Sequence, residues 1–164
     1  MRRTILLLAA IALMLAMVGT PAAAEPPVPA TGVWSWVGGE WNQVDLPSGG
    51  ARFTGTEFGH WTGTFVGTSA ESYKGVIMPN GTLTALIRIE FTGSVDGAHG
   101  TLLMQTTVWA KSLVEPMTGR WVILGGSGDL ANLRGQGAWI FESCDEDPPW
   151  RCYADYSGQV NIVP

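Results

Sequence analysis

The glycine-rich segment between residues 125 and 137 most strongly constrains the fold. An apolar stretch, Trp121-Val122-Ile123-Leu124, runs directly into Gly125-Gly126-Ser127-Gly128, and a second strand-like stretch follows Gly135-Gln136-Gly137. Glycine is unfavourable inside a helix and very short helices are marginal, so any helix here ends after about two turns. The segment therefore predicts two strands joined by a turn, with one short helical turn at Asp129 to Leu133.

The same glycines formally match a nucleotide-binding pattern. Gly126, Gly128 and Ala131 satisfy G-x-G-x-x-[GA] after an apolar strand. A dinucleotide site also needs a long helix whose N-terminal amides face the pyrophosphate, and Gly135 and Gly137 prevent one. We favour the structural interpretation and expect no cofactor.

The rest of the chain has the pattern of β-strands. In Thr82 to Phe91 and Thr101 to Lys111, apolar and polar residues alternate, which is typical of strands with one buried face. Asp96-Gly97 predicts a hairpin turn between these two strands. Further strands are expected at 33–37, 51–58, 60–68, 73–78, 119–124, 136–142 and 153–162.

Strands in this number, with no long helical pattern between them, predict an all-β protein. Glycines inside several strands favour a strongly coiled sheet, because glycine is found where strands bend or another backbone approaches. We predict a single antiparallel eight-stranded β-barrel over residues 33–164.

The N-terminus has the three parts of a secretory signal peptide. Arg2 and Arg3 precede the uncharged run from Ile5 to Val18, and Ala22-Ala23-Ala24 offers a cleavage site. Residues 1–24 are therefore predicted to be removed, with a proline-rich tether at 25–32 and no membrane anchor after cleavage. The apolar run is shorter than the roughly 20 residues that span a bilayer. A secreted or periplasmic location follows.

Charge excludes two classes of partner. Without Arg2 and Arg3 the chain has seven Lys and Arg residues against 14 Asp and Glu residues, a formal charge of −7. Nucleic acids and anionic membrane surfaces attract basic patches, so we expect neither as a partner. The composition leaves the oligomeric state open.

The two cysteines, Cys144 and Cys152, are close in an exported chain, which predicts a disulfide. Acidic residues between them, at 145–147, together with Asp155 could supply oxygen ligands to calcium. Their spacing differs from that of a calcium-binding loop, so no metal site is predicted.

Residues 125–137 resemble the G-[ST]-G-x-[LF]-x-x-[LAV]-x-G-x-G segment of allene oxide cyclase-like barrels, especially the uncharacterised bacterial DUF3224 proteins. Phe53-Thr54-Gly55, Gly63-Thr64-Phe65 and the stretch from Phe91 to Leu102 are similar to other parts of that group. The resemblance implies an eight-stranded barrel with an apolar interior. Its plant relatives cyclise a fatty-acid epoxide or, as dirigent proteins, steer the coupling of phenoxy radicals. No catalytic residue can be carried over.

Four residues are predicted to contact a ligand: Glu57, His60, Trp61 and Trp109. A carboxyl group that points into an apolar barrel would have a raised pKa suited to acid–base chemistry. His60 stands beside Trp61 at a strand start, although a structural role is favoured for it. The only other histidine is His99, so the sequence offers few candidates for the histidine of a catalytic triad.

Three functions remain open. The first is an exported, non-enzymatic barrel that binds a small apolar molecule or acts as a scaffold. The second is an isomerase, cyclase or dirigent-like protein with an acidic residue in the lumen. The third is a glycan-binding module that stacks sugars on exposed tryptophans such as Trp34, Trp36 and Trp150.

Overall fold

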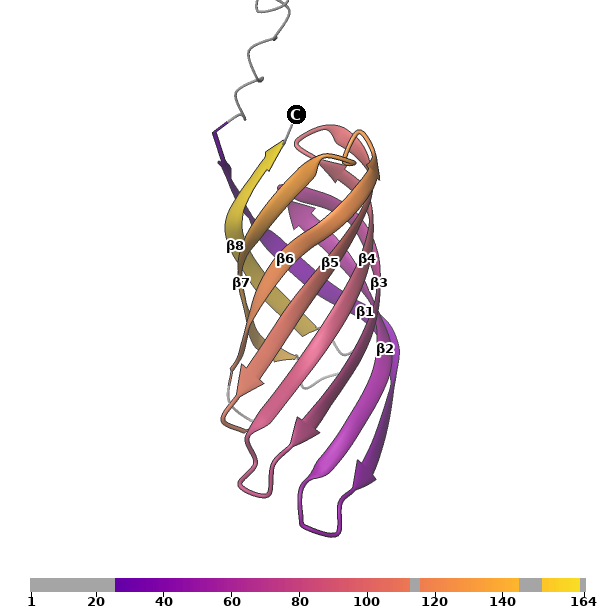
Figure 1. Cartoon of the computed structure of the whole chain (residues 1–164), viewed down its shortest axis with the longest axis vertical. Coiled ribbons are helices and arrows are strands. Elements are labelled where there is room, and N and C mark those ends of the chain that lie inside the picture. The colour runs from indigo at the N-terminus through magenta and orange to yellow at the C-terminus, as the bar shows by residue number, and fades with distance from the viewer. Residues whose placement is uncertain (1–25, 113–115, 145–151, 163–164) are drawn as a thin grey trace, which may run out of the picture.

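The computed structural model describes residues 26–112, 116–144 and 152–162, which form a closed antiparallel β-barrel (Figure 1). Strands follow one another around the barrel in chain order. They are β1 (Val28–Asp45), β2 (Ala51–Gly63), β3 (Phe65–Ile77), β4 (Leu83–Val95), β5 (Ala98–Ala110), β6 (Met117–Gly128), β7 (Leu133–Cys144) and β8 (Cys152–Ile162). The predicted eight-stranded barrel is confirmed.

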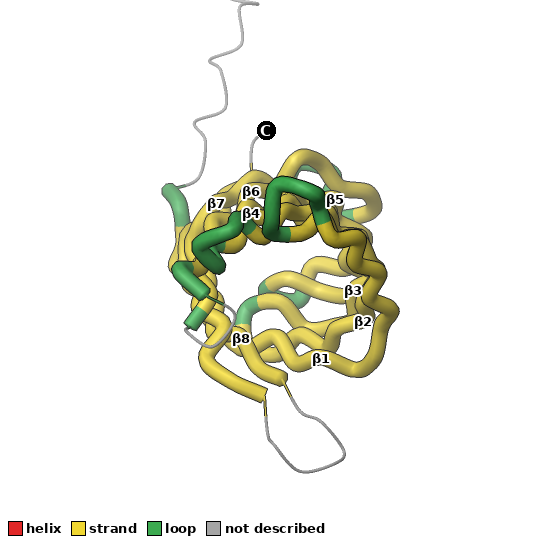
Figure 2. Tube along the Cα trace, turned by 90° about the horizontal axis from the view of Figure 1, so that it is seen from below, coloured by secondary structure: helices red, strands yellow, loops and turns green. Residues whose placement is uncertain are grey.

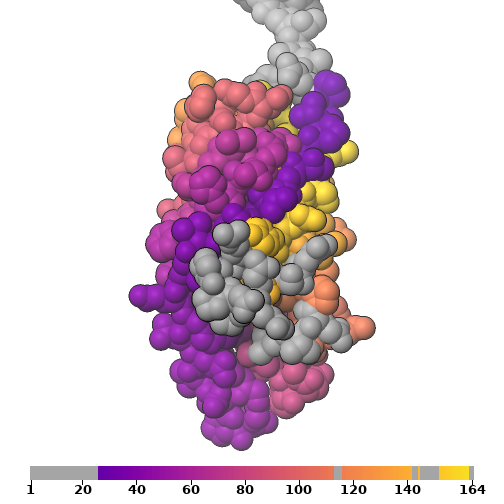
Figure 3. All heavy atoms as spheres, turned by 180° about the vertical axis from the view of Figure 1, so that it is seen from behind, coloured from indigo at the N-terminus to yellow at the C-terminus, as the bar shows by residue number. Residues whose placement is uncertain are grey.

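The barrel is closed by β1 pairing with β8, side by side on the face shown in Figure 3. The paired residues run from Val28 opposite Val160 to Ser35 opposite Tyr153. The prediction of a tether at 25–32 is therefore wrong from Val28 onward. Main-chain pairing with β8 makes this proline-containing stretch the first part of strand β1. After Trp36 the strand has a bulge and then continues beside β2 to Asp45.

The boundary between β2 and β3 also lies at a different position from the predicted one. We expected strands at 51–58 and 60–68, whereas β2 continues to Gly63 and the turn lies at Gly63-Thr64. Gly63 has a φ of 97°, a left-handed conformation that glycine adopts without a steric cost. The residues at 60–63 therefore belong to β2 and those at 65–68 to β3.

The segment after β6 is a turn and not the predicted helical turn. Leu130 N–H bonds to Ser127 C=O at 3.2 Å and Ala131 N–H to Gly128 C=O at 3.2 Å. These overlapping i to i+3 bonds end before a helix forms, and the described part of the chain contains no helix. The turn places Leu130, which is 1% exposed, over one end of the barrel.

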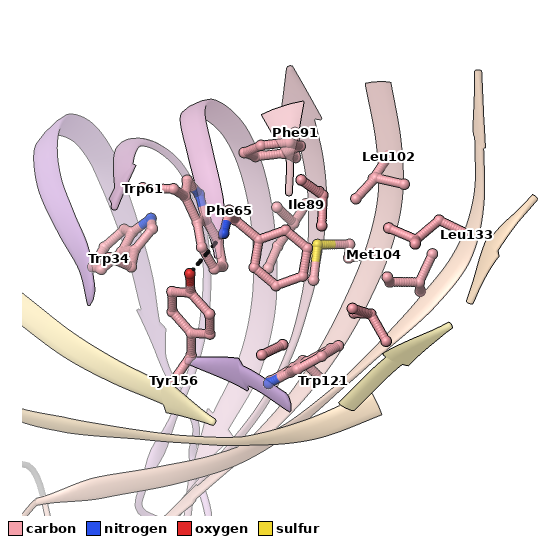
Figure 4. Packing of buried hydrophobic residues seen from close by; sticks show 14 of the residues in the cluster. Trp34, Trp61, Phe65, Ile89, Phe91, Leu102, Met104, Trp121, Leu133 and Tyr156 are labelled. Carbon is pink, nitrogen blue, oxygen red and sulfur yellow. Dashed lines mark hydrogen bonds between the residues drawn. The ribbon is translucent and has the colours of Figure 1, made fainter. Parts of the chain in front are cut away.

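That end of the barrel is filled by apolar side chains (Figure 4). Phe65 meets Phe91 and Trp121 edge to face, with ring centroids 5.8 Å apart in both pairs. Such edge-to-face pairs stabilise aromatic cores beyond the apolar area they bury. Leu102, Met104, Leu133 and Val160 complete the packing. The predicted hairpin turn at Asp96-Gly97 joins β4 to β5.

The predicted disulfide between Cys144 and Cys152 is present. It is typical of a chain that folds in an oxidising compartment. The described residues contain no helix long and apolar enough to cross a membrane. The predicted signal peptide, the acidic residues at 145–147 and Trp150 lie outside the described residues.

Candidate functional site

The half of the barrel away from Leu130 contains a cavity of about 260 Å³. Figure 2 looks into the barrel from this end. An apolar cavity of about 150 Å³ is enough to hold benzene, so this one could take a molecule of one or two fused rings. Aromatic rings dominate its wall, contributed by Trp34, Trp36, Trp41, Phe53, Trp61, Tyr73, Trp121, Trp139, Phe141 and Tyr156.

Two carboxyl groups, those of Glu57 and Glu71, line the cavity. Strand alternation places them there, because Glu57 shares the lumenal face of β2 with Phe53 and Trp61, and Glu71 shares that of β3 with Phe65. Glu57 and Glu71 are also directly opposite each other in the β2–β3 register. The Cβ atoms of such cross-strand pairs are about 4.5–5.5 Å apart, and like charges in them destabilise a sheet.

Glu71 is held in place by two hydrogen bonds to the same oxygen. Trp34 Nε1 donates to Glu71 Oε1 at 2.8 Å and Ser69 Oγ donates to it at 2.5 Å. Ser69 in turn accepts a hydrogen bond from Trp61 Nε1 at 2.9 Å. This chain of donors orients the carboxyl group of Glu71, whose side chain is only 6% exposed.

The other oxygens of the pair remain available to a ligand. Among the described residues, no side chain donates to the second oxygen of Glu71 or to Glu57. Yet among the described residues no fully buried side-chain polar atom lacks a hydrogen-bond partner. The unpartnered oxygens of Glu57 and Glu71 are therefore not fully buried, and they border the cavity, where a bound molecule can reach them.

Burial raises the pKa of both carboxyl groups. The pKa of Glu57 is raised from 4.5 to about 7 by desolvation. That of Glu71 is raised to about 8, first by desolvation and then by the neighbouring charge of Glu57, against the lowering effect of its bonds from Ser69 and Trp34. Near neutral pH the pair can therefore both release and accept a proton.

Glycines on β2 make room for the rings beside this pair. Gly55, Glu57 and Gly59 alternate with outward-facing residues, so all three share the lumenal face. A Cβ at Gly59 would overlap the indole nitrogen of Trp34, and one at Gly55 would overlap the phenol oxygen of Tyr73. Each glycine thus lets a ring from a neighbouring strand pass over β2.

The same arrangement recurs elsewhere in the barrel. Trp139 on β7 lies over Gly119 on β6 and donates from Nε1 to Thr106 Oγ1 on β5 at 2.6 Å. Tyr156 on β8 lies over Gly32 on β1, and its hydroxyl donates to Thr62 C=O on β2 at 3.0 Å. Such pairing of a ring with a glycine on the adjacent strand protects the glycine backbone. It accounts for the glycines at positions 32, 55, 59 and 119, each of which faces such a ring.

The predicted ligand-contact residues divide into two groups. Glu57 and Trp61 line the cavity. His60 and Trp109 lie on the outer face, where Trp109 is 47% exposed. They are separated from the cavity by the sheet itself, because the residues on either side of each of them point inward.

Two of the three tryptophans considered for glycan stacking, Trp34 and Trp36, point into the barrel. Trp34 is buried and Trp36 is partly buried, and both line the cavity. These two therefore do not form a flat platform on the outer surface. Trp150 lies outside the described residues.

Glu71 is the site residue that the sequence interpretation missed. It falls between the predicted strands at 60–68 and 73–78, so the predicted alternation assigns it to no face. Extending the alternation from Phe65 through Ser69 to Tyr73 places Glu71 on the lumenal side. This longer run of alternation is the sequence signal that identifies Glu71 as a lumenal residue.

No basic residue lines the cavity within the described part of the chain. Its ionisable lining groups are Glu57, Glu71, Tyr73 and Tyr156. The described residues also bring together no group of three or more His, Cys, Asp or Glu side chains that could hold a metal ion. The site is thus an acidic, aromatic pocket inside an antiparallel barrel.

Among solved structures, the chain is similar in fold to a DUF3224 family protein of unknown function from Shewanella oneidensis MR-1. The TM-score is 0.58 at 12% sequence identity, over 85% of this chain and 99% of the other. The resemblance to DUF3224 proteins is therefore confirmed at the level of the fold. No protein-family model and no curated protein sequence matches the chain.

Proposed function

We propose that the protein is exported and that its barrel binds a small, largely apolar molecule in the cavity. The observation that carries this proposal is the cavity of about 260 Å³ walled by aromatic rings, with two carboxyl groups at one side. Binding sites for small molecules are mostly apolar and contain a few convergent polar groups that orient the ligand. The cavity in the half of the barrel away from Leu130 fits this description.

Export is supported by two features. The N-terminal residues have the pattern of a signal peptide, and the Cys144–Cys152 disulfide suits an oxidising compartment. In this proposal the ligand is met outside the cytoplasm.

Titration with 1-naphthylmethanol, a neutral molecule of two fused rings, followed by calorimetry tests the binding proposal. We expect saturable binding to the oxidised protein. The variant Ala85→Phe places a ring in the cavity, which Ala85 lines, and should abolish binding. Trp109→Phe, on the outer face, is the matched control and should bind normally. Equal binding by the Ala85→Phe variant would contradict a lumenal site.

A second candidate function is proton transfer on a bound molecule. It is favoured by the paired carboxyl groups of Glu57 and Glu71, whose pKa values of about 7 and 8 allow one to act as acid and the other as base. Such a pair could isomerise a ligand by moving a proton between carbons.

Deuterium exchange at the carbon beside the carbonyl of 2-tetralone, followed by NMR in D₂O, tests this candidate. Catalysed exchange that is lost in both Glu57→Gln and Glu71→Gln is expected of a proton-transfer site. Exchange at the uncatalysed rate would contradict proton transfer, and ligand binding would then be the only proposed function.

A further inference from the structure

The barrel contains an acidic pair for which the described residues supply no counterion. Glu57 and Glu71 are direct cross-strand neighbours, and no Lys, Arg or His side chain lines the cavity in the part of the chain that the structure describes. Its other ionisable lining groups, Tyr73 and Tyr156, are neutral near pH 7, and the pKa of each is raised further by burial. Nothing basic there balances two carboxylates.

Buried carboxyl groups need a compensating positive charge or a proton. Hydrogen bonds from Trp34 and Ser69 satisfy one oxygen of Glu71. Its second oxygen and the Glu57 carboxyl still face the cavity. A positively charged group at this position would gain charge-assisted hydrogen bonds, which are about twice as strong as neutral ones.

The aromatic wall is suited to the same kind of ligand. Trp36, Trp41 and Trp139 line the cavity together with the carboxyl pair. The faces of indole rings attract cations, most strongly where water is excluded. The rings would also cover the apolar body of the molecule.

We propose that the ligand is a hydrophobic amine that binds as its ammonium ion, with the charged nitrogen between Glu57 and Glu71 and the apolar part against the tryptophans. This inference rests on the proposed function, because it requires that the cavity bind a small molecule. It narrows the ligand from apolar molecules in general to monocations with one or two rings.

The protonation of the pair provides an independent readout. The pKa values of Glu57 and Glu71, about 7 and 8, mean that the empty site holds protons near neutral pH. An ammonium ion should displace them, whereas a neutral ligand should not. Binding of an amine at pH 7 therefore releases protons, which calorimetry in two buffers of different ionisation enthalpy measures.

The test compares 1-naphthylmethylamine with 1-naphthylmethanol, which have nearly the same shape and differ in charge. We expect the amine to bind at least about 10-fold more tightly than the alcohol at pH 8. The preference should shrink at pH 5.5, where the carboxyl groups are protonated while the amine keeps its charge.

Two variants test the role of the acidic pair. Glu57→Gln/Glu71→Gln should lose the preference for the amine and still bind the alcohol. Glu40→Gln/Glu90→Gln removes the same charge from exposed positions and should keep the preference. Near-UV circular dichroism establishes that each variant is folded. If the first double variant does not fold, the pH series on the unmodified protein decides alone.

The possible results separate the two proposals. Equal or tighter binding of the alcohol at pH 8 would overturn the ammonium ligand and leave the binding function standing. An amine preference that survives in Glu57→Gln/Glu71→Gln would also overturn it. If neither molecule binds, both proposals are wrong.

Discussion

Trp34 on β1 and Glu71 on β3 are joined by a hydrogen bond of 2.8 Å that passes over the strand between them. The crossing is possible because Gly59 on β2 has no side chain beneath the indole ring. The absence of a side chain at Gly59 thus allows a contact between the first and third of three adjacent strands, and this contact orients a buried carboxyl group of the cavity. The same contact therefore packs β1 across β2 and positions a carboxyl group of the candidate site.

Substitution of that glycine should therefore damage the site. In Gly59→Ala, the new methyl group would overlap the Trp34 indole and force the ring away from Glu71, with a loss of about 2–4 kcal/mol in the free energy of unfolding. Urea denaturation measures the loss. Gly125→Ala is the control, because a Cβ there meets no atom within 4 Å. Equal stability of the two variants would contradict the crossing.

Removal of the indole donor should change the titration of Glu71. Trp34→Phe keeps a ring over Gly59 and deletes the N–H that lowers the pKa of Glu71. We expect that pKa to rise further, with a loss of about 1–2 kcal/mol in stability. A ¹³C NMR titration of the carboxyl carbon measures the pKa. In Trp109→Phe, on the outer face, it should not move.

Stability should depend on pH through the acidic pair. Because the pKa values of Glu57 and Glu71 are raised from 4.5 to about 7 and 8, the folded protein holds protons that the unfolded chain releases. The free energy of unfolding should therefore fall between about pH 5 and 8, by an amount on the order of 6 kcal/mol. Urea denaturation at each pH measures this change. Glu57→Gln/Glu71→Gln should flatten the curve, and a curve with the same slope in both proteins would refute the buried pair.

The disulfide should contribute to stability. Cys144 and Cys152 are eight residues apart, and closing a loop of this size stabilises a fold by about 2–3 kcal/mol in the chain-entropy model. Cys144→Ala/Cys152→Ala should lose about that much in urea denaturation. The unmodified protein measured with a reductant is the control, and it should match the variant. No difference between oxidised and reduced protein would show that the bond adds nothing to stability.

The fold was predictable because alternation in the sequence is clearest where the lumen is apolar. In β4 and β5, the residues from Leu83 to Phe91 and from Leu102 to Ala110 alternate between the core and the outer face as expected. The disulfide and the Asp96-Gly97 turn were likewise visible in local sequence. These features depend on near neighbours in the chain.

The site was harder to predict because its lumenal residues are polar or glycine. On β2, Gly55, Glu57 and Gly59 interrupt the apolar pattern between Phe53 and Trp61, and on β3 the inward residues Ser69 and Glu71 do the same. A search for apolar alternation ends at such positions and breaks one strand into two. The partners of these glycines, Trp34 and Tyr73, come from other strands and are found only once the register is known.

The most direct test of the central claim is native mass spectrometry of the protein exported into an oxidising compartment, before and after organic extraction. A lumenal binding protein is predicted to carry an adduct that extraction removes, on a chain two hydrogens lighter than its reduced mass. The adduct should be absent from Ala85→Phe, whose cavity is filled. A bare chain under both conditions, or an adduct that Ala85→Phe retains, would contradict binding in the barrel.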